Sequence, residues 1–314
     1  MDTIHERLRS SDPAVRRVAV IDLPYSDEED DALPHLVAAL ADADPGVRLE
    51  AAKALEGNEE PEALAALAPL LKDPDAEVRA AVALTLAELK GPACAPYLLP
   101  YLADGDARVR AAALHAIKAL RVEAAFAPAL AALADAEPGV RRAAVGVLGY
   151  LKKAEAIGAL TNAAANDPDD EVRRVAVGAL GYASAVSVQP ALSCVLSDPA
   201  WQVREEAATT IGKLGLAHCV PDLVNAMNDA YWQVRLKSAR SLGKLRARTA
   251  VPALCEALRH PMSNLRKEAV IALGDIADTR AISHLEQALG DSDPDVRKLS
   301  KLALATIYLN GGAP

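Results

Sequence analysis

Aromatic residues are scarce in this 314-residue sequence, which contains one Phe, two Trp and seven Tyr, or 3% of the chain. Hydrophobic residues nevertheless make up 52%, and most of them are Ala and Leu. These residues favour the helix and leave room for close packing between helices. The composition therefore suits tightly stacked helices.

Long apolar runs are also missing. No uncharged apolar stretch approaches the roughly 18 residues that a membrane-spanning helix needs. The N-terminal residues Met1–Arg7 are charged and lack the apolar core of a secretory signal. We therefore expect a cytoplasmic protein with no membrane partner.

Cysteine is rare, with four residues and no Cys-x-x-Cys pair. Cys94 and Cys219 fall at equivalent positions near the start of two predicted helices. We interpret them as buried free thiols rather than metal ligands.

The sequence lacks a continuous basic track. The formal net charge is −9, and residues 1–100 alone carry 9 basic and 20 acidic side chains. Because nucleic-acid binding requires a basic surface, this distribution argues against general nucleic-acid binding. The acidic run Ser26–Asp31 is interpreted as a solvated cap loop, with a docking site for a basic partner as the alternative.

The sequence does contain one stretch that occurs ten times, most fully from Asp198 to Gly215. Its Val-Arg step, once Leu-Arg, recurs every 31 or 32 residues. A fixed period of this length indicates a repeat array. The repeated arginines are Arg16, Arg48, Arg79, Arg110, Arg141, Arg173, Arg204, Arg235, Arg266 and Arg297.

Three apolar positions recur around each arginine. The residue before it is Val or Leu, the third after it is usually Ala, and the seventh after it is Leu or Ile. This spacing lies on one face of a helix, which predicts a buried stripe on a helix that we call helix B. A shorter apolar segment with Pro in or near its first turns precedes it and predicts a helix A. The repeat unit is therefore helix–turn–helix.

The residues that flank helix B predict its ends. An acidic residue followed by Pro predicts the N-cap and the first helical position. Glycine eight residues after the arginine predicts the C-terminal end. The N-terminal pairs are Asp12-Pro13, Asp44-Pro45, Glu137-Pro138 and Asp293-Pro294, and the glycines are Gly149, Gly181, Gly212, Gly243 and Gly274.

The arginine itself needs a partner, because a cation near a helix N-terminus faces the unfavourable end of the helix dipole. Asp stands six residues before it in eight of the ten copies. We expect these Asp–Arg pairs to form a ladder of charge-assisted bonds between neighbouring turns, a structural role rather than a ligand site.

The pattern Asp-x-x-x-x-Val-Arg-x-x-Ala-x-x-x-Leu-Gly, with Pro in helix A, resembles the HEAT repeat. The short period resembles the HEAT-like subclass named after phycobilisome lyases. The resemblance implies an all-α fold, an α-α superhelix or solenoid of about ten HEAT-like repeats of about 31 residues. We expect a single solenoid over residues 1–314, with capping repeats at 1–31 and 281–310.

The same resemblance allows a test for enzymatic activity. Deoxyhypusine hydroxylases, a HEAT-like family, hold iron with His-Glu pairs at the two positions after the equivalent arginine. No copy here has His at those positions, and the only His-Glu pair, His5-Glu6, lies on the first predicted A helix. No nucleophile–base pair, phosphate loop or metal spacing occurs either. These absences favour a non-catalytic protein without a cofactor.

In HEAT arrays the B helices line the concave surface. The positions one, five and nine residues after the arginine face away from the buried stripe, and two successive repeats carry Arg, Gly and Tyr there. Glycine inside a helix costs about 1 kcal/mol relative to Ala. Either the bare backbone forms a shallow functional groove or the pattern reflects repeat duplication. The residues are Arg142, Gly146 and Tyr150, then Arg174, Gly178 and Tyr182.

Trp201 and Trp232 occupy equivalent positions in the seventh and eighth repeats, at the predicted start of helix B. They predict an exposed apolar ledge, because Trp, Tyr and Arg are enriched in binding hot spots. The alternative is that both indoles cover the turn below them and are buried. Glu205, Lys237 and Arg240 add mixed charge beside them.

We therefore expect a non-catalytic scaffold, adaptor or assembly factor that binds another protein on its concave face. The alternative is a tetrapyrrole (bilin) lyase or chaperone, which the subclass resemblance implies. The predicted contact residues are Arg142, Tyr150, Arg174, Tyr182, Trp201, Glu205, Trp232, Lys237 and Arg240.

Overall fold

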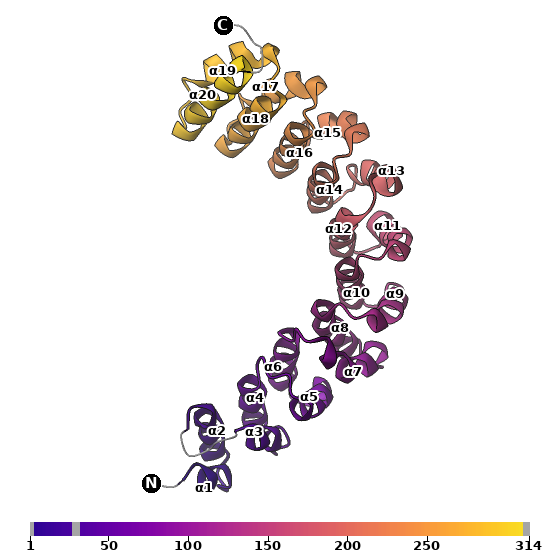
Figure 1. The fold of residues 1–314 in the computed structure, drawn as a ribbon, viewed down its shortest axis with the longest axis vertical. Coiled ribbons are helices and arrows are strands. Elements are labelled where there is room, and N and C mark those ends of the chain that lie inside the picture. Colours follow the sequence, from indigo (N-terminus) through magenta and orange to yellow (C-terminus); the bar gives the residue numbers. More distant parts are fainter. Residues whose placement is uncertain (1–2, 27–31, 310–314) are drawn as a thin grey trace. The chain divides into compact units, whose positions relative to one another are not determined.

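The structure is a computed structural model that describes residues 3–26 and 32–309. Within these residues it contains twenty α-helices and no β-strand, and within each of its two compact units, defined below, the helices pack in sequence as in an α solenoid (Figure 1). The predicted all-α fold class is confirmed. The acidic run lies, apart from Ser26, outside the described residues.

The helices alternate between the two predicted kinds. The A helices are α1 (Ile4–Leu8), α3 (Leu33–Ala39), α5 (Pro61–Leu67), α7 (Ala95–Leu98), α9 (Phe126–Ala132), α11 (Ile157–Asn166), α13 (Ala185–Val195), α15 (Val220–Ala226), α17 (Val251–Ala257) and α19 (Ile282–Ala288). The B helices are α2 (Pro13–Asp22), α4 (Pro45–Ala54), α6 (Ala76–Ala87), α8 (Ala107–Ile117), α10 (Pro138–Leu151), α12 (Asp170–Ala179), α14 (Trp201–Leu214), α16 (Trp232–Lys244), α18 (Ser263–Ile276) and α20 (Pro294–Leu309).

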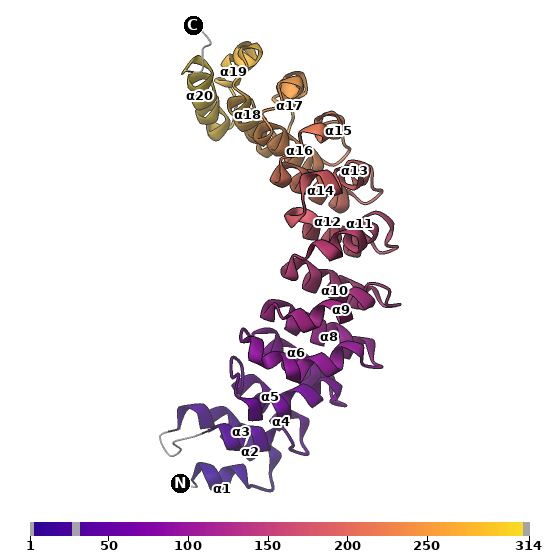
Figure 2. The same ribbon diagram turned by 45° about the vertical axis from the view of Figure 1, so that its right-hand side comes forward.

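The chain divides into two compact units, Met1–Leu151 (unit 1) and Lys152–Pro314 (unit 2). Within each unit, every B helix packs on the B helix of the next repeat, and the A helices form a second layer (Figures 1 and 2). We call the solvent-exposed side of the B-helix layer of a unit its B face. That residues 1–314 form one solenoid stays a prediction.

The predicted stripe forms the core between the layers. Each of its positions is buried except Val15, which is 36% exposed. Val15 belongs to the first repeat, which packs against a neighbouring repeat on one side only within the described residues. The stripe thus packs between the helices of its own and neighbouring repeats.

Three of the four predicted N-terminal caps are confirmed, at Asp12, Asp44 and Asp293. Asp12 accepts a hydrogen bond from the Ala14 N–H at 2.9 Å, and Asp44 accepts one from the Val47 N–H at 3.1 Å. Pro is the first residue of α2, α4, α10 and α20, as predicted. These caps satisfy N–H groups that have no partner within the helix.

The C-terminal prediction was wrong. The glycines eight residues after the arginine lie within α10, α14, α16 and α18 or in the 3-10 helix η8 (Leu180–Tyr182). After the glycines of α10, α14, α16 and α18, the left-handed residue stands three positions later, and it is Lys152, Gly215, Arg246 or Ala277, with φ between 49° and 69°.

The early glycines instead permit close approach between successive B helices. A β-carbon added at Gly243 would lie 2.8 Å from Cα of Ala272 on α18. One added at Gly212 would lie 2.2 Å from Oγ of Ser241 on α16. Because only glycine leaves this space, the position is set by packing and not by backbone conformation.

The arginine ladder is confirmed. Six arginines donate from Nε and Nη2 to both carboxylate oxygens of the aspartate in the next repeat, at 2.6–3.0 Å. Their Nη1 atoms also donate to backbone carbonyls of the preceding turn. The pairs are Arg16–Asp42, Arg48–Asp73, Arg110–Asp135, Arg173–Asp198, Arg204–Asp229 and Arg266–Asp291.

The ladder is interrupted in unit 2. His260 stands where the next repeat supplies Asp elsewhere, and its Nδ1 accepts a hydrogen bond from the Met262 N–H at 3.1 Å. The Nε atom of Arg235 is consequently buried without a hydrogen-bond partner among the described residues. This repeat junction lacks the arginine–aspartate pair that joins six of the others.

No helix in residues 3–26 and 32–309 is long and apolar enough to cross a membrane.

Candidate functional site

The first predicted Arg–Gly–Tyr group lies on the B face of α10 in unit 1. Arg142 is exposed, and Tyr150 keeps 44% of its surface exposed. Two cations from the preceding repeat flank the Tyr150 ring, with Lys118 Nζ at 5.9 Å and Arg121 Cζ at 5.6 Å from its centroid. These distances are typical of cation–π contacts. The structure therefore joins the predicted Arg142 and Tyr150 to cations that sequence analysis did not select.

His115 on α8 belongs to the same surface. Lys118 Nζ lies 3.5 Å from His115 Nδ1, and because an ammonium can only donate, that nitrogen is the acceptor. Partial desolvation, followed by the charges of Lys118 and Arg142, lowers the pKa of His115 below its usual value. The imidazole is therefore neutral near pH 7 and adds no positive charge to this surface.

Gly146 lies between these groups. A β-carbon there would meet only Lys118 Cδ, at 3.8 Å, which is ordinary van der Waals contact. Packing therefore does not require glycine at this position.

The second Arg–Gly–Tyr group lies on α12 and η8 in unit 2, and its members have internal partners. Arg174 donates to both carboxylate oxygens of Glu171, at 2.8 and 2.6 Å. The Tyr182 hydroxyl donates to the Lys153 carbonyl oxygen at 3.1 Å. A β-carbon at Gly178 would lie 3.0 Å from Oε1 of Glu206 on α14, so this backbone is covered rather than bare. The two groups share a sequence pattern but not a chemical environment.

The two tryptophans have different neighbours. Trp201, the first residue of α14, stacks on Tyr231 with ring centroids 5.5 Å apart and an interplanar angle of 15°. Arg204 Cζ lies 5.8 Å from the centroid of the Tyr231 ring. The stacking partner of Trp201 is thus the N-cap residue of α16, and not Trp232.

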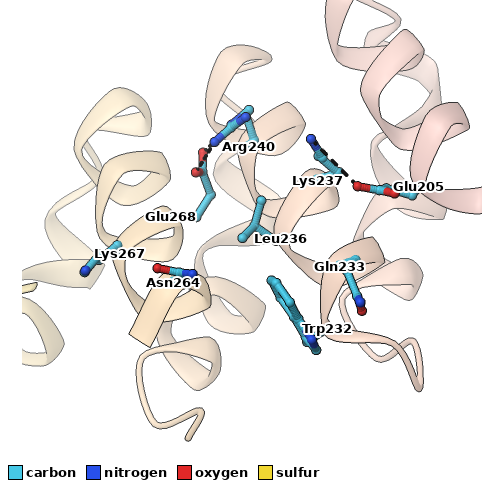
Figure 3. Close-up of a pocket in the computed structure, with 9 residues that line it drawn as sticks. All are labelled: Glu205, Trp232, Gln233, Leu236, Lys237, Arg240, Asn264, Lys267 and Glu268. Carbon is cyan, nitrogen blue, oxygen red and sulfur yellow. Dashed lines mark hydrogen bonds and ion pairs between the residues drawn. The ribbon is translucent and has the colours of Figure 1, made fainter. Parts of the chain in front are cut away.

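Trp232 instead lines a pocket of about 360 Å³ in unit 2. Figure 3 shows Leu236 of α16 between the Trp232 indole and the pair formed by Arg240 and Glu268. Arg240 donates to both oxygens of Glu268, at 2.9 and 2.7 Å, which connects α16 to α18. The pocket therefore has an apolar floor and a charged rim.

Lys237 of α16 and Glu205 of α14 complete the opposite rim. Their charged atoms are 3.8 Å apart, which is an ion pair without a hydrogen bond. Such a loose pair can be exchanged for a partner's charge at little cost. The pocket thus combines four of the predicted contact residues: Glu205, Trp232, Lys237 and Arg240.

Sequence analysis missed the contribution of α18, which supplies Asn264, Lys267 and Glu268 to the pocket. The position one residue after the arginine, already assigned to the exposed face, is Glu205, Leu236 and Lys267 in three successive repeats. Following that position along the repeats would have found the third helix. Trp232 lies three residues before its arginine and could only be placed by the fold.

The cysteines are free, and Cys94 and Cys219 are buried, as predicted. Burial raises the pKa of both thiols, which disfavours the nucleophilic thiolate. In residues 3–26 and 32–309, no three His, Cys, Asp or Glu residues are grouped so that they could hold a metal ion.

The fold and these surfaces define a helical-repeat protein. The family model described as HEAT repeats matches residues 1–87, 33–118, 64–149, 126–182, 157–229 and 220–305. The chain therefore belongs to the HEAT-repeat family. HEAT repeats are typically scaffolds for protein–protein interaction.

Solved structures share the fold at low sequence identity. An engineered protein has a TM-score of 0.54 and 21% identity over 97% of this chain and 98% of its own. The Escherichia coli protein YibA has a TM-score of 0.54 and 18% identity over 95% and 97%. A chain from a structure of Kap95p bound to RanGDP has a TM-score of 0.61 and 16% identity, over 96% of this chain and 48% of that chain. No curated protein matches the sequence.

Proposed function

We propose that this protein is a non-catalytic interaction scaffold that binds another protein on its B face, the surface that HEAT arrays make concave. The observation that carries the proposal is the pocket between α14, α16 and α18, which brings Trp232, Lys237 and Arg240 together with Glu205. An apolar floor with a polar rim is the usual anatomy of an interaction hot spot.

The remaining predicted residues extend this surface to different degrees. Trp201 adds an aromatic stack, and Arg142 and Tyr150 belong to the B face of unit 1. Arg174 is already paired with Glu171, and Tyr182 with the Lys153 carbonyl. Because a partner would have to replace these contacts, the two residues contribute less to the affinity for a partner.

The proposal is tested by capture from the native lysate with immobilised protein. Wild type is compared with Lys237→Glu, which reverses charge at the pocket rim, and with Arg259→Glu after α17, whose side chain is 66% exposed outside the pocket. We expect a protein retained by wild type and by Arg259→Glu but lost with Lys237→Glu. Identical recovery on all three proteins would reject the pocket as the contact.

Tryptophan fluorescence then tests direct contact. The chain has only Trp201 and Trp232, so Trp201→Phe leaves the pocket indole as the sole reporter. Adding the captured protein should shift the emission of Trp201→Phe, because a partner displaces water from the pocket. An unchanged spectrum at saturating partner would place the contact elsewhere.

The finer family assignment is also a proposal. The 31-residue period and the repeat motif support membership of the short phycobilisome-lyase-type subclass. The scaffold proposal predicts that adding a bilin or haem leaves the visible absorption of the pigment unchanged. A saturable spectral shift would favour the tetrapyrrole lyase or chaperone instead.

A further inference from the structure

The B face of unit 1 carries a cluster of cations without carboxylate partners. Lys118, Arg121 and Arg142 surround Tyr150 and His115 on α8, the 3-10 helix η5 (Lys118–Leu120) and α10. None of these three cations forms an ion pair among the described residues. We call this set of five residues the cationic cluster.

No acidic residue lies within the two segments that carry the cluster. Residues 111–122 and 138–154 contain neither Asp nor Glu. Glu123, Glu137 and Glu155 border these stretches, and Glu88, at the position equivalent to Tyr150 two repeats earlier, is exposed after α6. In contrast to the paired ladder arginines, these three cations are left without a carboxylate partner in the described residues.

Helix dipoles explain only part of this arrangement. Lys118 and Arg121 follow the C-terminal end of α8, where a cation is favourable. Arg142 lies in the second turn of α10, toward the N-terminal end, where a cation gains nothing from the dipole. The helix dipole therefore does not account for a cation at this position.

The sixth repeat shows what a neutralised copy looks like. There Glu171, three residues before Arg174, binds the guanidinium through both oxygens. The equivalent residue before Arg142 is Gly139, which has no side chain to do so. The arginine of the Arg–Gly–Tyr group is thus neutralised by an internal carboxylate in unit 2, whereas the equivalent arginine in unit 1 is not.

We infer that the cationic cluster binds an acidic segment of a partner protein, whose carboxylates pair with Arg142, Arg121 and Lys118 over the Tyr150 ring. This deepens the proposed function and rests on it in taking the occupant to be a protein. A short acidic segment needs only local positive charge, whereas a nucleic acid needs a continuous basic track. The net charge of −9 and the acidic first hundred residues oppose such a track.

Leu84 adds an apolar contact at the edge of the cluster. It is 72% exposed on α6, at the position that His115 and Gly146 occupy on α8 and α10. The three helices pack in succession, so these positions form one row across the B face. The acidic segment that fits best therefore carries an apolar residue at one end.

The test uses two labelled synthetic peptides and the 314-residue protein. One peptide has a leucine followed by four glutamates, and the other has a leucine followed by four glutamines. Fluorescence anisotropy measures the binding of each peptide. We expect the glutamate peptide to bind, more weakly as salt is raised, and the glutamine peptide not to bind. Arg142→Gln should weaken binding about three- to fivefold, the range of a single exposed ion pair.

Arg121→Gly separates binding from folding. Arg121 has φ 53°, a conformation that glycine adopts without strain, so the variant loses the cation without losing stability. It too should weaken binding about three- to fivefold. Arg108→Gln, at the other end of α8 and paired with Asp106, is the control for removing one positive charge and should not change binding.

The inference would be overturned if both peptides bind wild type equally. It would also be overturned if wild type, Arg142→Gln and Arg121→Gly bind the glutamate peptide equally. So would tighter binding of a single-stranded RNA oligonucleotide with the same dependence on Arg142 and Arg121, since the cluster would then be a nucleic-acid site. These outcomes leave the lysate capture through Lys237 unaffected. Failure of that capture alone would reject the pocket and not the cluster.

Discussion

At the scale of single residues, the repeated arginine links each repeat to the next. Its planar guanidinium binds both oxygens of an aspartate one repeat away while a third nitrogen satisfies turn carbonyls. Lysine, with a single ammonium group, could not make this fork, so the position selects arginine for geometry as much as for charge.

The missing link at His260 leads to a stability prediction. His260→Asp should supply the carboxylate that Arg235 lacks and raise the free energy of unfolding by about 1–2 kcal/mol. Urea denaturation of wild type and variant measures the difference. The reverse change, Asp229→His, removes the partner of Arg204 and should lower stability. An unchanged midpoint for His260→Asp would show that the ladder contributes nothing at this junction.

His260 also predicts a dependence on pH. Desolvation and the charges of Arg235 and Arg266 lower its pKa in the folded protein, although the hydrogen bond from Met262 opposes this. The unfolded chain then binds a proton more readily, so stability is fully present above pH 6.5 and falls as the pH drops below that value. Urea midpoints between pH 7 and 5 should decline less for His260→Asp. Parallel curves would rule His260 out as the titrating group.

At the scale of elements, glycine has two different roles on the B helices. Gly243 lies against the backbone of α18, whereas a β-carbon at Gly146 would meet only Lys118 Cδ, at van der Waals distance. Contact between successive B helices therefore depends on the first glycine and not on the second.

A matched pair of substitutions tests this difference. Gly243→Ala should destabilise the protein by about 1–3 kcal/mol, because the new methyl group would lie 2.8 Å from Cα of Ala272. Gly146→Ala should stabilise it by up to about 1 kcal/mol through helix propensity. Thermal unfolding followed by circular dichroism compares them. Equal effects would mean that α16 and α18 move apart without cost.

At the scale of the whole molecule, the described residues of each unit pack between neighbouring repeats, so stability depends on a series of repeat junctions. Hydrogen bonds from the ladder arginines lower the pKa of Asp42, Asp135 and Asp291. A lowered carboxyl pKa gives stability that is present above the unfolded value of 3.8 and is lost as the pH falls through the folded value. Because several junctions titrate together, acid should unfold the protein cooperatively.

Asp135→Asn isolates one junction of this ladder. It should cost about 1–3 kcal/mol at neutral pH, because Arg110 loses its charged partner. The difference from wild type should disappear as the pH falls through the folded pKa of Asp135, where the wild-type carboxyl is itself neutral. Denaturation at a series of pH values measures it. A difference that persists in acid would assign the cost to packing instead.

The sequence alone was sufficient for the repeat, the helix pair, the buried stripe, the N-caps and the arginine ladder. Each depends on residues a few positions apart or one period apart, and the period itself places successive copies side by side. The same logic failed for glycine eight residues after the arginine. A cap and a close helix contact both favour glycine, and the sequence does not distinguish them.

Only the tertiary structure decided which candidate surfaces remain open. The two Arg–Gly–Tyr groups are alike in sequence, yet Arg174 is neutralised within its helix and its glycine is covered by Glu206, while Arg142 has no ion-pair partner in the described part of the chain. Likewise Trp201 stacks on Tyr231 and not on Trp232, and Trp232 lines a pocket together with residues of α18. Periodicity determines where a backbone lies, whereas long side chains choose partners among all the groups within their reach, which only folding brings together.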